Sequence, residues 1–226
     1  MTFPPDFLNV DDVNLMNAQD LEVAVVPHSL DEPLSPILSL DVSESLDMVV
    51  TAHANGNVCL HSMKKQSEHR VIGVWNPFAK SKSCARSVTF ASRATNVEKK
   101  YAVVVGGGNG EMWLNIIDPD SKEGHEGVVF KDEFVQKIEP NHIGPVISLT
   151  SRPQGLIMSV GHDGMIRMTQ TWISGKTKKM PSPVYGLGGY KVWIGSICVD
   201  EEGKRLISDG MDDAVVVHDF SLDKNE

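Results

Sequence analysis

Short runs of alternating or wholly apolar residues, separated by turn-forming residues, recur along this chain. In the clearest stretch, residues 146–169, VISLT alternates, LIMSV is apolar, and MIRMT alternates again after a His-Asp-Gly turn. Short runs rich in apolar and β-branched side chains, bounded by Gly, Asn or Asp, are typical of β-strands joined by hairpin turns. The pattern therefore predicts an antiparallel meander in this part of the chain.

The same layout occurs four times. The turn glycines Gly56, Gly110 and Gly164 follow one another at intervals of 54 residues, and Asp213 takes the fourth turn position. The strand-like runs of the other units are ILSLDVS, LDMVVTA, NVCLHS and VIGVW; SVTFAS, YAVVVG, EMWLNII and GVVF; and WIGSICVD, RLISDG and AVVVHDF. Periods near this length are typical of propellers and other repeat arrays. We expect repeats at about 36–76, 85–131, 142–186 and 190–220.

These units resemble the WD40 repeat family, whose pattern has a His before the first strand, Ser or Thr in the second, Asp in the tight turn and Trp at the end of the third. In the third unit His142, Ser159 and Asp163 match the pattern, and Thr169 stands at the Trp position. The other units match in part: Thr51, Asn55 and His61 in the first; Val105, Asn109 and Asn115 in the second; Tyr190, Ser208, Asp212 and His218 in the fourth.

The resemblance implies an all-β, WD40-like β-propeller of about four recognisable four-stranded blades. The propeller domain would cover residues 21–220, between an N-terminal extension at 1–20 and a tail at 221–226. A turn Asp can accept hydrogen bonds from its own backbone while its second oxygen reaches a His ring. We therefore expect a structural hydrogen-bond network that includes His142, Ser159, Asp163, Ser208, Asp212, Thr51 and Asn55. The alternative is a generic β-sandwich, because Asp-Gly and Asn-Gly turns suit any hairpin.

Four blades are few for this family, whose members usually have seven or eight. The last unit ends after its third strand, and the strand-like run LEVAVV at residues 21–26 precedes the first unit. This run could close the last blade, as the N-terminal strand does in the family. The other possibilities are a ring built from two chains by homodimerisation and an open array completed by a partner, because unpaired strand edges are normally covered.

No motif for catalysis or cofactor binding stands out. The glycine-rich run at 106–110 lacks phosphate-loop spacing and opens a strand, so we interpret it as an inter-strand turn. No His or Cys pair has metal-site spacing. A Ser-His-Asp trio can be drawn from Ser159, His142 and Asp163, but in the WD40 family this trio is structural. We expect no catalytic residues, no metal and no cofactor.

Composition limits the compartment and the partners. The net charge of -9 and the pI near 5.3 disfavour nucleic-acid binding by the whole surface. No apolar run reaches the length of a membrane span, and the N-terminus lacks the features of a secretory signal. The three unpaired cysteines favour a reducing, intracellular location in cytoplasm or nucleus, or in an organelle after removal of a leader, with the cysteines as small buried hydrophobes.

The most informative function that the sequence supports is a non-catalytic protein-interaction scaffold, a subunit of a larger complex. Candidate partner-binding residues are the aromatic Trp75, Trp172, Tyr190 and Trp193 and the basic Lys176, Lys178 and Lys179. Trp75 and Trp172 could instead cap the blade edges. The first alternative is an incomplete propeller that another chain must complete. A propeller hydrolase with an axial metal is disfavoured, because the first strands offer apolar and hydroxyl residues rather than repeated carboxylates.

Overall fold

The protein folds into four antiparallel β-sheets that follow one another along the chain. The computed structural model describes residues 35–63, 71–94, 99–117, 130–152, 155–171, 182–187, 194–200, 202, 204–211 and 214–219. Within these ranges every sheet is a meander in which each strand pairs with the strand that follows it in the sequence. We call the sheets blades 1 to 4.

The strands of the blades have the following bounds. Blade 1 consists of β1 (Ile37–Ser43), β2 (Met48–His53), β3 (Val58–Ser62) and β4 (Val71–Trp75), with a 3-10 helix, η1 (Glu44–Leu46), after β1. Blade 2 consists of β5 (Ala85–Ala94), β6 (Lys99–Gly107), β7 (Met112–Ile117) and β8 (Phe130–Ile138). Blade 3 consists of β9 (Val146–Arg152), β10 (Leu156–Gly161), β11 (Ile166–Gln170) and β12 (Ser182–Leu187). Blade 4 consists of β13 (Ile197–Val199), β14 (Arg205–Met211) and β15 (Ala214–Asp219).

The turn between the second and third strands is built alike in blades 1, 2 and 3. A side-chain oxygen accepts a hydrogen bond from the backbone N–H two residues later, at 3.0 Å in Asn55–Asn57, 3.2 Å in Asn109–Glu111 and 3.3 Å in Asp163–Met165. A glycine with positive φ follows each of these residues: Gly56, Gly110 and Gly164. Asx turns and left-handed glycines favour tight hairpins, so the repeated Asn-Gly and Asp-Gly sequences explain why the chain reverses at these points.

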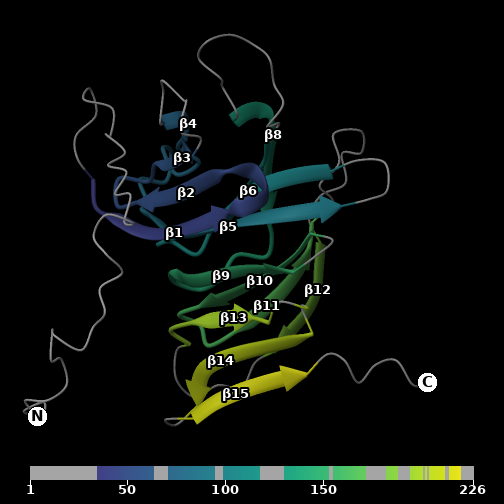
Figure 1. Ribbon diagram of the computed structural model, residues 1–226. Helices are drawn as coiled ribbons and strands as arrows, with labels where there is room; N and C mark the ends of the chain where they lie inside the picture. Colours follow the sequence, from purple (N-terminus) through teal and green to yellow (C-terminus); the bar gives the residue numbers. More distant parts are fainter. Residues whose placement is uncertain are drawn as a thin grey trace, which may run out of the picture.

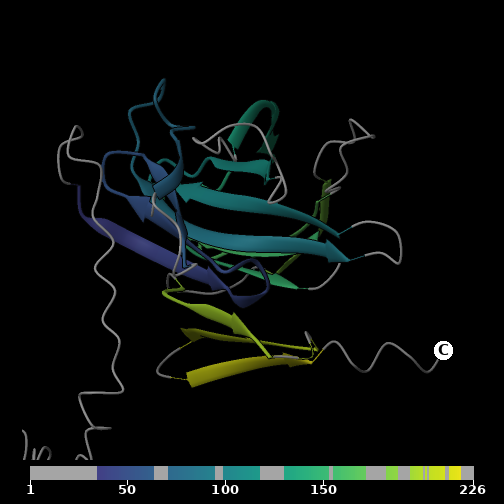
Figure 2. The same ribbon diagram turned by 45° about the horizontal axis from the view of Figure 1, so that its top comes forward.

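The blades pack face to face in chain order, as the stacked sheets in Figure 1 and the tilted view in Figure 2 show. The first strands β1, β5, β9 and β13 are neighbours in that order, and each contact between consecutive blades buries an apolar core. Blade 2 thus covers Val50 and Leu60 of blade 1, and blade 4 covers Met158 and Met168 of blade 3. Burial between sheets supplies the main stabilisation of this arrangement.

Polar contacts also join the first strands. Asp41 Oδ2 on β1 accepts hydrogen bonds from Thr89 Oγ1 at 3.0 Å and from the backbone N–H of Phe90 at 2.7 Å, both on β5. Ser87 Oγ on β5 donates to the carbonyl of Val146 on β9 at 3.0 Å, and Ser151 Oγ on β9 donates to the carbonyl of Phe90 at 2.6 Å. Because these bonds lie between blades, they fix the register of blade 2 against blades 1 and 3.

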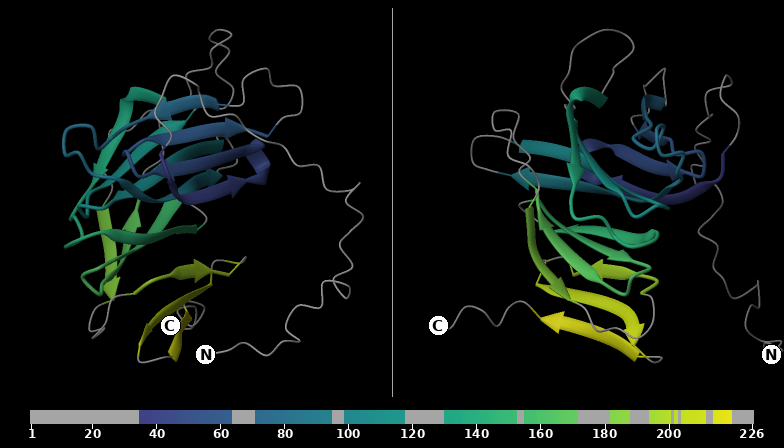
Figure 3. Two further views of the ribbon diagram at one scale, coloured as in Figure 1. Left: turned by 90° about the vertical axis from the view of Figure 1, so that its left-hand side faces the viewer. Right: turned by 180° about the vertical axis from the view of Figure 1, so that it is seen from behind.

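The expected fold class, an all-β and WD40-like propeller, is confirmed. Blades 1 to 3 have four strands each, and three strands of blade 4 are described. In the described part of the chain the row of blades does not close into a ring, and blades 1 and 4 lie at its two ends (Figure 3). The run at residues 21–26, which we expected to be able to close blade 4, lies outside the described residues.

One expectation about side-chain burial is wrong in part. All three cysteines are free; Cys59 is buried on β3 as expected, but Cys84 is half-buried and Cys198 is exposed. Cys198 lies on β13, in a row with Ile207 and Val217 on the neighbouring strands of blade 4. None of the described blades packs on that face of blade 4, which explains the exposure.

Candidate functional site

A group of hydrogen-bonded polar side chains lies where the loop before blade 3 meets the β10–β11 turn. His142 Nε2 is 2.9 Å from Ser159 Oγ, and His142 Nδ1 is 2.9 Å from Asp163 Oδ1. Asp163 Oδ2 accepts a hydrogen bond from the backbone N–H of Ile143 at 3.0 Å and from a guanidinium N–H of Arg167 at 3.1 Å. The structure thus brings together the three residues that the repeat pattern selects in this unit.

The arrangement fixes the protonation of the two ionisable groups. Burial of the imidazole lowers the pKa of His142 and outweighs the neighbouring Asp163 carboxylate, which raises it. Burial raises the pKa of Asp163, but hydrogen bonds from His142 and from the backbone of Ile143 and Met165 outweigh this effect and leave the pKa below its usual value. A neutral His142 next to a carboxylate donates from Nδ1 to Asp163, so Nε2 accepts the Ser159 hydroxyl proton.

The chain of hydrogen bonds has the order of a catalytic triad, but its environment differs. Ser159 is 1% exposed, and the His142 side chain is fully buried. A nucleophile must reach a substrate carbonyl, and Ser159 has no exposed surface from which to do so. The group holds the loop at residues 139–145 against the β10–β11 turn, and the guanidinium of Arg167 extends it to the carbonyls of Pro140 and Asn141.

The lowered pKa values predict that acid destabilises the protein through this group. Because the folded state binds a proton at His142 less readily than the unfolded chain, stability is fully present above the unfolded pKa of 6.5 and decreases as the pH falls below it. A further decrease, from Asp163, occurs below its unfolded pKa of 3.8. Urea unfolding from pH 8 to pH 5 measures the first part.

The control for this prediction is His142→Gln. The variant keeps every other histidine, so the difference between its pH profile and that of the wild type isolates His142. We expect the variant to lose less stability between pH 7 and pH 5 than the wild type. Parallel profiles would contradict the assignment of a neutral His142 in the folded protein.

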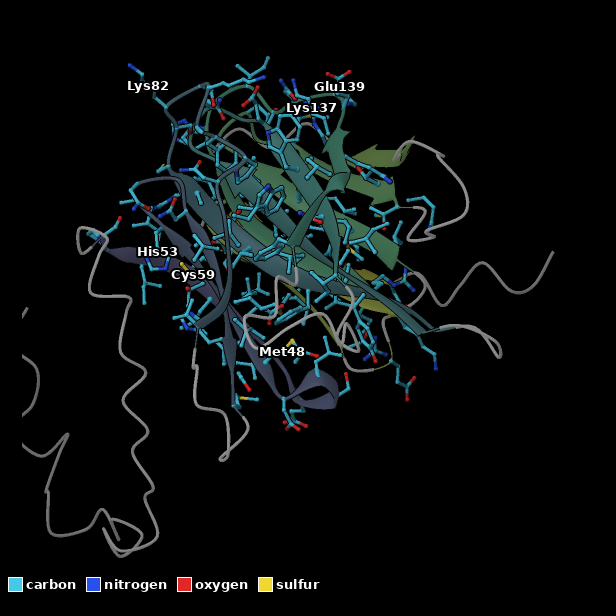
Figure 4. All side chains as sticks on the ribbon, turned by 90° about the horizontal axis from the view of Figure 1, so that it is seen from above. Met48, His53, Cys59, Lys82, Lys137 and Glu139 are labelled. Atoms are coloured by element: carbon cyan, nitrogen blue, oxygen red, sulfur yellow. The ribbon has the colours of Figure 1, made fainter. Side chains whose placement is uncertain are left out.

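Blade 1 has a similar hydrogen-bonded group, but its imidazole comes from a different position in the repeat. The loop before blade 1 contributes no ring in the described residues; instead His53, at the end of β2, places Nε2 2.9 Å from Thr51 Oγ1 and Nδ1 3.1 Å from the carbonyl of Ser35. His61 Nε2 lies 3.0 Å from the same hydroxyl. His53 and Cys59 lie close together in blade 1, and Met48 marks the opposite end of β2 (Figure 4). The backbone N–H of Asn55 donates to Ser35 Oγ at 2.9 Å, so Thr51, through His53, and Asn55 are both connected to Ser35.

Glycines show that the three blades share one side-chain position, which we call the slot. Counted from the turn glycine, His53 of blade 1 corresponds to Gly107 of blade 2 and Gly161 of blade 3. A Cβ on Gly161 would lie 2.3 Å from His142 Nδ1, and a Cβ on Gly107 would lie 2.5 Å from the Phe78 ring. The slot is thus filled by His142 in blade 3, by Phe78 in blade 2 and by the strand residue itself, His53, in blade 1.

The sequence reasoning missed two of these three residues. Phe78 is 1% exposed and sits seven residues before Ala85, the first residue of β5, whereas His142 sits four residues before Val146. The slot in blade 2 therefore contains a ring that makes no polar contact with the turn. A signal was present in the sequence: the residue two positions after Val105 and Ser159 is Gly, and in these blades the loop supplies the ring. The residue two positions after Thr51 is His, and in that blade the strand supplies it.

In blade 4 a different carboxylate holds the preceding loop. Asp209 Oδ1 accepts hydrogen bonds from the backbone N–H groups of Gly195 at 2.9 Å and Ser196 at 3.0 Å. Ser208, which the pattern predicts for this network, is buried, but its Oγ has no hydrogen-bond partner among the described residues. Asp212 and Tyr190 lie outside the described residues.

The candidate partner-binding residues fall mostly outside the described ranges; these are Trp172, Tyr190, Trp193, Lys176, Lys178 and Lys179. Trp75 is 8% exposed and packs against Phe130 of blade 2, with ring centroids 5.5 Å apart. Its burial favours the alternative role of capping a blade edge, because a buried ring cannot serve as an anchor for a partner without a rearrangement.

A cleft of about 320 Å³ lies near the far ends of the first strands. Hydroxyl groups line it, with one carboxylate, Asp41, from β1. Asp41 already accepts the hydrogen bonds that join blades 1 and 2, and its other oxygen accepts the N–H of Val42 at 2.8 Å. The carboxylate therefore serves the packing of the blades.

Other candidate chemistry has a structural explanation. The glycine-rich run ends β6 and forms the turn to β7, with Gly108 N–H donating to the carbonyl of Cys84 at 3.0 Å, which confirms the predicted inter-strand turn. Among the described residues no group of three or more His, Cys, Asp or Glu side chains is arranged to hold a metal ion. No helix in these ranges is long and apolar enough to cross a membrane.

Comparison with solved structures agrees with the fold. The crystal structure of the WD40 β-propeller domain of Doa1 superimposes with a TM-score of 0.52 at 16% sequence identity, covering 82% of this chain and 51% of that one. This chain thus spans about half the length of the Doa1 chain. No protein-family model and no curated protein sequence matches the chain. At this level of identity the likeness establishes the WD40-type propeller as the fold.

Proposed function

We propose that this protein is a non-catalytic interaction scaffold of the WD40 type, acting inside the cell as a subunit of a protein complex. The observation that carries the proposal is the burial of the His142–Ser159–Asp163 group. These three residues have the order of a catalytic triad, but their hydrogen bonds hold a loop against a turn. A fold that fixes its loops in this way presents a rigid surface, and rigid loop surfaces on β scaffolds commonly bind other proteins.

The surface proposed to bind partners is the turn face, defined by the turns at 54–57, 108–111 and 162–165 and the loops at 76–84 and 139–145. These segments are bonded to one another: Asn76 Nδ2 donates to Asn57 Oδ1 at 2.9 Å, Asn109 N–H donates to Ser83 Oγ at 3.1 Å, and His142 N–H donates to the carbonyl of Gly110 at 3.0 Å. Ile143 stands out on this face with 80% of its surface exposed. An exposed aliphatic side chain on a fixed loop is a suitable contact for an apolar pocket on a partner.

The test is isolation of the native particle, with its chains identified by mass spectrometry, for the wild type and for Ile143→Asp. We expect defined partner chains with the wild type and their loss in the variant. The matched control is Val74→Asp, an exposed aliphatic residue on the outer strand β4. Partners retained by Ile143→Asp, or the absence of any partner from the wild-type particle, would overturn the assignment of the turn face.

A further inference from the structure

Every blade has two faces: a leading face, on the side of the preceding blade in the chain, and a trailing face, on the side of the following blade. The trailing face of a blade packs on the leading face of the next blade in the chain, and each of the three buried apolar clusters forms at one such contact. Among the described residues, the row of four blades therefore ends in two faces on which no blade packs, the leading face of blade 1 and the trailing face of blade 4.

The leading face of blade 1 has the residues of a buried face but is exposed. Leu40 on β1 is 60% exposed. The residues at the same position in the other blades are Val88, Leu149 and Ile197. In every blade, the residue at this position on the first strand pairs with the second-strand residue that lies four positions before the turn Asp or Asn. Those three residues are 3%, 9% and 6% exposed. Leu40 thus occupies a position that is covered by the preceding blade everywhere else in the chain.

The trailing face of blade 4 shows the same mismatch. Val215 and Val217 on β15 are 70% and 55% exposed. They lie two and four residues after the turn position Asp213. The residues two and four positions after the turn glycines of the earlier blades are at most 4% exposed: Val58 and Leu60, Met112 and Leu114, and Ile166 and Met168. Together with the exposed Cys198, these residues form an apolar surface of the kind that soluble proteins normally cover.

We propose that a second copy of this chain covers both faces, so that two copies form one eight-bladed ring. The trailing face of blade 4 in each copy packs on the leading face of blade 1 in the other. This pairing is the one that the chain already forms three times between its own blades. One further copy supplies both kinds of face at once, and a two-fold axis along the ring axis closes the assembly. Eight blades is within the range of known propellers.

The test uses the full chain in sedimentation equilibrium. The wild type is expected at twice the chain mass of 24.7 kDa. Leu40→Asp and Val217→Asp each place a charge in both copies of the contact, so each is expected to weaken dimerisation at least about a hundredfold. Both residues are exposed in the single copy, so the variants are expected to fold. Ile143→Asp, which changes an exposed aliphatic residue on the turn face and away from both of these faces, is expected to dimerise normally.

Mixing the two variants tests the order of the faces. In a mixed pair, one of the two contacts carries both substitutions and the other carries none, so an equimolar mixture is expected to recover dimers that neither variant forms alone. Failure of the mixture to recover dimers would overturn the head-to-tail pairing. A wild type that stays monomeric, or that forms an open-ended polymer, would overturn the two-copy ring. Neither result would contradict the proposed binding of partners at the turn face, which the Ile143→Asp experiment tests separately.

Discussion

Replacement of Asp163 by alanine is expected to lower the free energy of unfolding by about 3–5 kcal/mol, the cost of removing one partner from a buried ionic and hydrogen-bonded group. The Asp163 side chain is 7% exposed and accepts hydrogen bonds from the His142 ring, from the N–H groups of Ile143 and Met165 and from Arg167. The substitution leaves the buried Nδ1–H of His142 without an acceptor, and such an orphaned donor keeps its full desolvation penalty.

Urea unfolding at pH 7.5 measures this loss. Asp200→Ala is a suitable control, because Asp200 also accepts two backbone hydrogen bonds, from Lys204 at 2.6 Å and Arg205 at 3.0 Å, but it does so on an exposed turn. The control is expected to cost about 1 kcal/mol or less. Equal losses in the two variants would mean that the group around Asp163 does not act as a buried unit.

Replacement of Gly110 by alanine is expected to cost about 2–5 kcal/mol, from left-handed strain of about 1–2 kcal/mol together with overpacking of about 1–3 kcal/mol. Gly110 has φ of +86°, and a Cβ there would lie 2.1 Å from the carbonyl oxygen of His142 and 2.8 Å from that of Gly144. Both neighbours are backbone atoms of the loop that His142 and Asp163 fix, so neither can move aside cheaply. The substitution therefore forces the β6–β7 turn away from the loop before blade 3.

Gly144→Ala separates the two contributions. Gly144 has the same φ of +86°, but its nearest neighbour to a Cβ is a side-chain atom of His162 at 3.2 Å. The control is expected to cost only about 1–2 kcal/mol, the left-handed strain alone. Thermal unfolding of the two variants under one set of conditions makes the comparison. A Gly110→Ala variant no less stable than Gly144→Ala would show that the turn and the loop are not held together as described.

The meanders could be predicted from the sequence because the residues that specify each strand and each turn lie close together in the chain. The alternation of VISLT and MIRMT, and the turn glycines at equal intervals, specify strand, turn and order without reference to distant residues. The same holds for His142, Ser159 and Asp163, whose spacing follows a repeat pattern. Packing of the blades in a row was implied by the repeat, since one sheet alone cannot bury its apolar faces.

The contents of the slot could not be predicted because the slot is defined in space. Phe78 and His142 reach it from loops of different length, and His53 reaches it from the strand. A pattern that searches for a His at fixed spacing before the first strand finds only one of these three. The burial of Trp75 could not be predicted either, because it depends on contact with Phe130 of the neighbouring blade.

The slot has a consequence for how the loops can change. In blade 3 the residue that secures the hairpin belongs to the loop, so a substitution at His142 alters the recognition surface and the stability of the hairpin together. In blade 1 the hairpin carries its own ring, His53, and the described residues ahead of β1 contribute the Ser35 hydroxyl and the backbone carbonyls of Ser35 and Pro36. Because this ring belongs to the strand, a substitution at Ser35 or Pro36 leaves the slot of blade 1 filled, whereas a substitution at His142 empties the slot of blade 3.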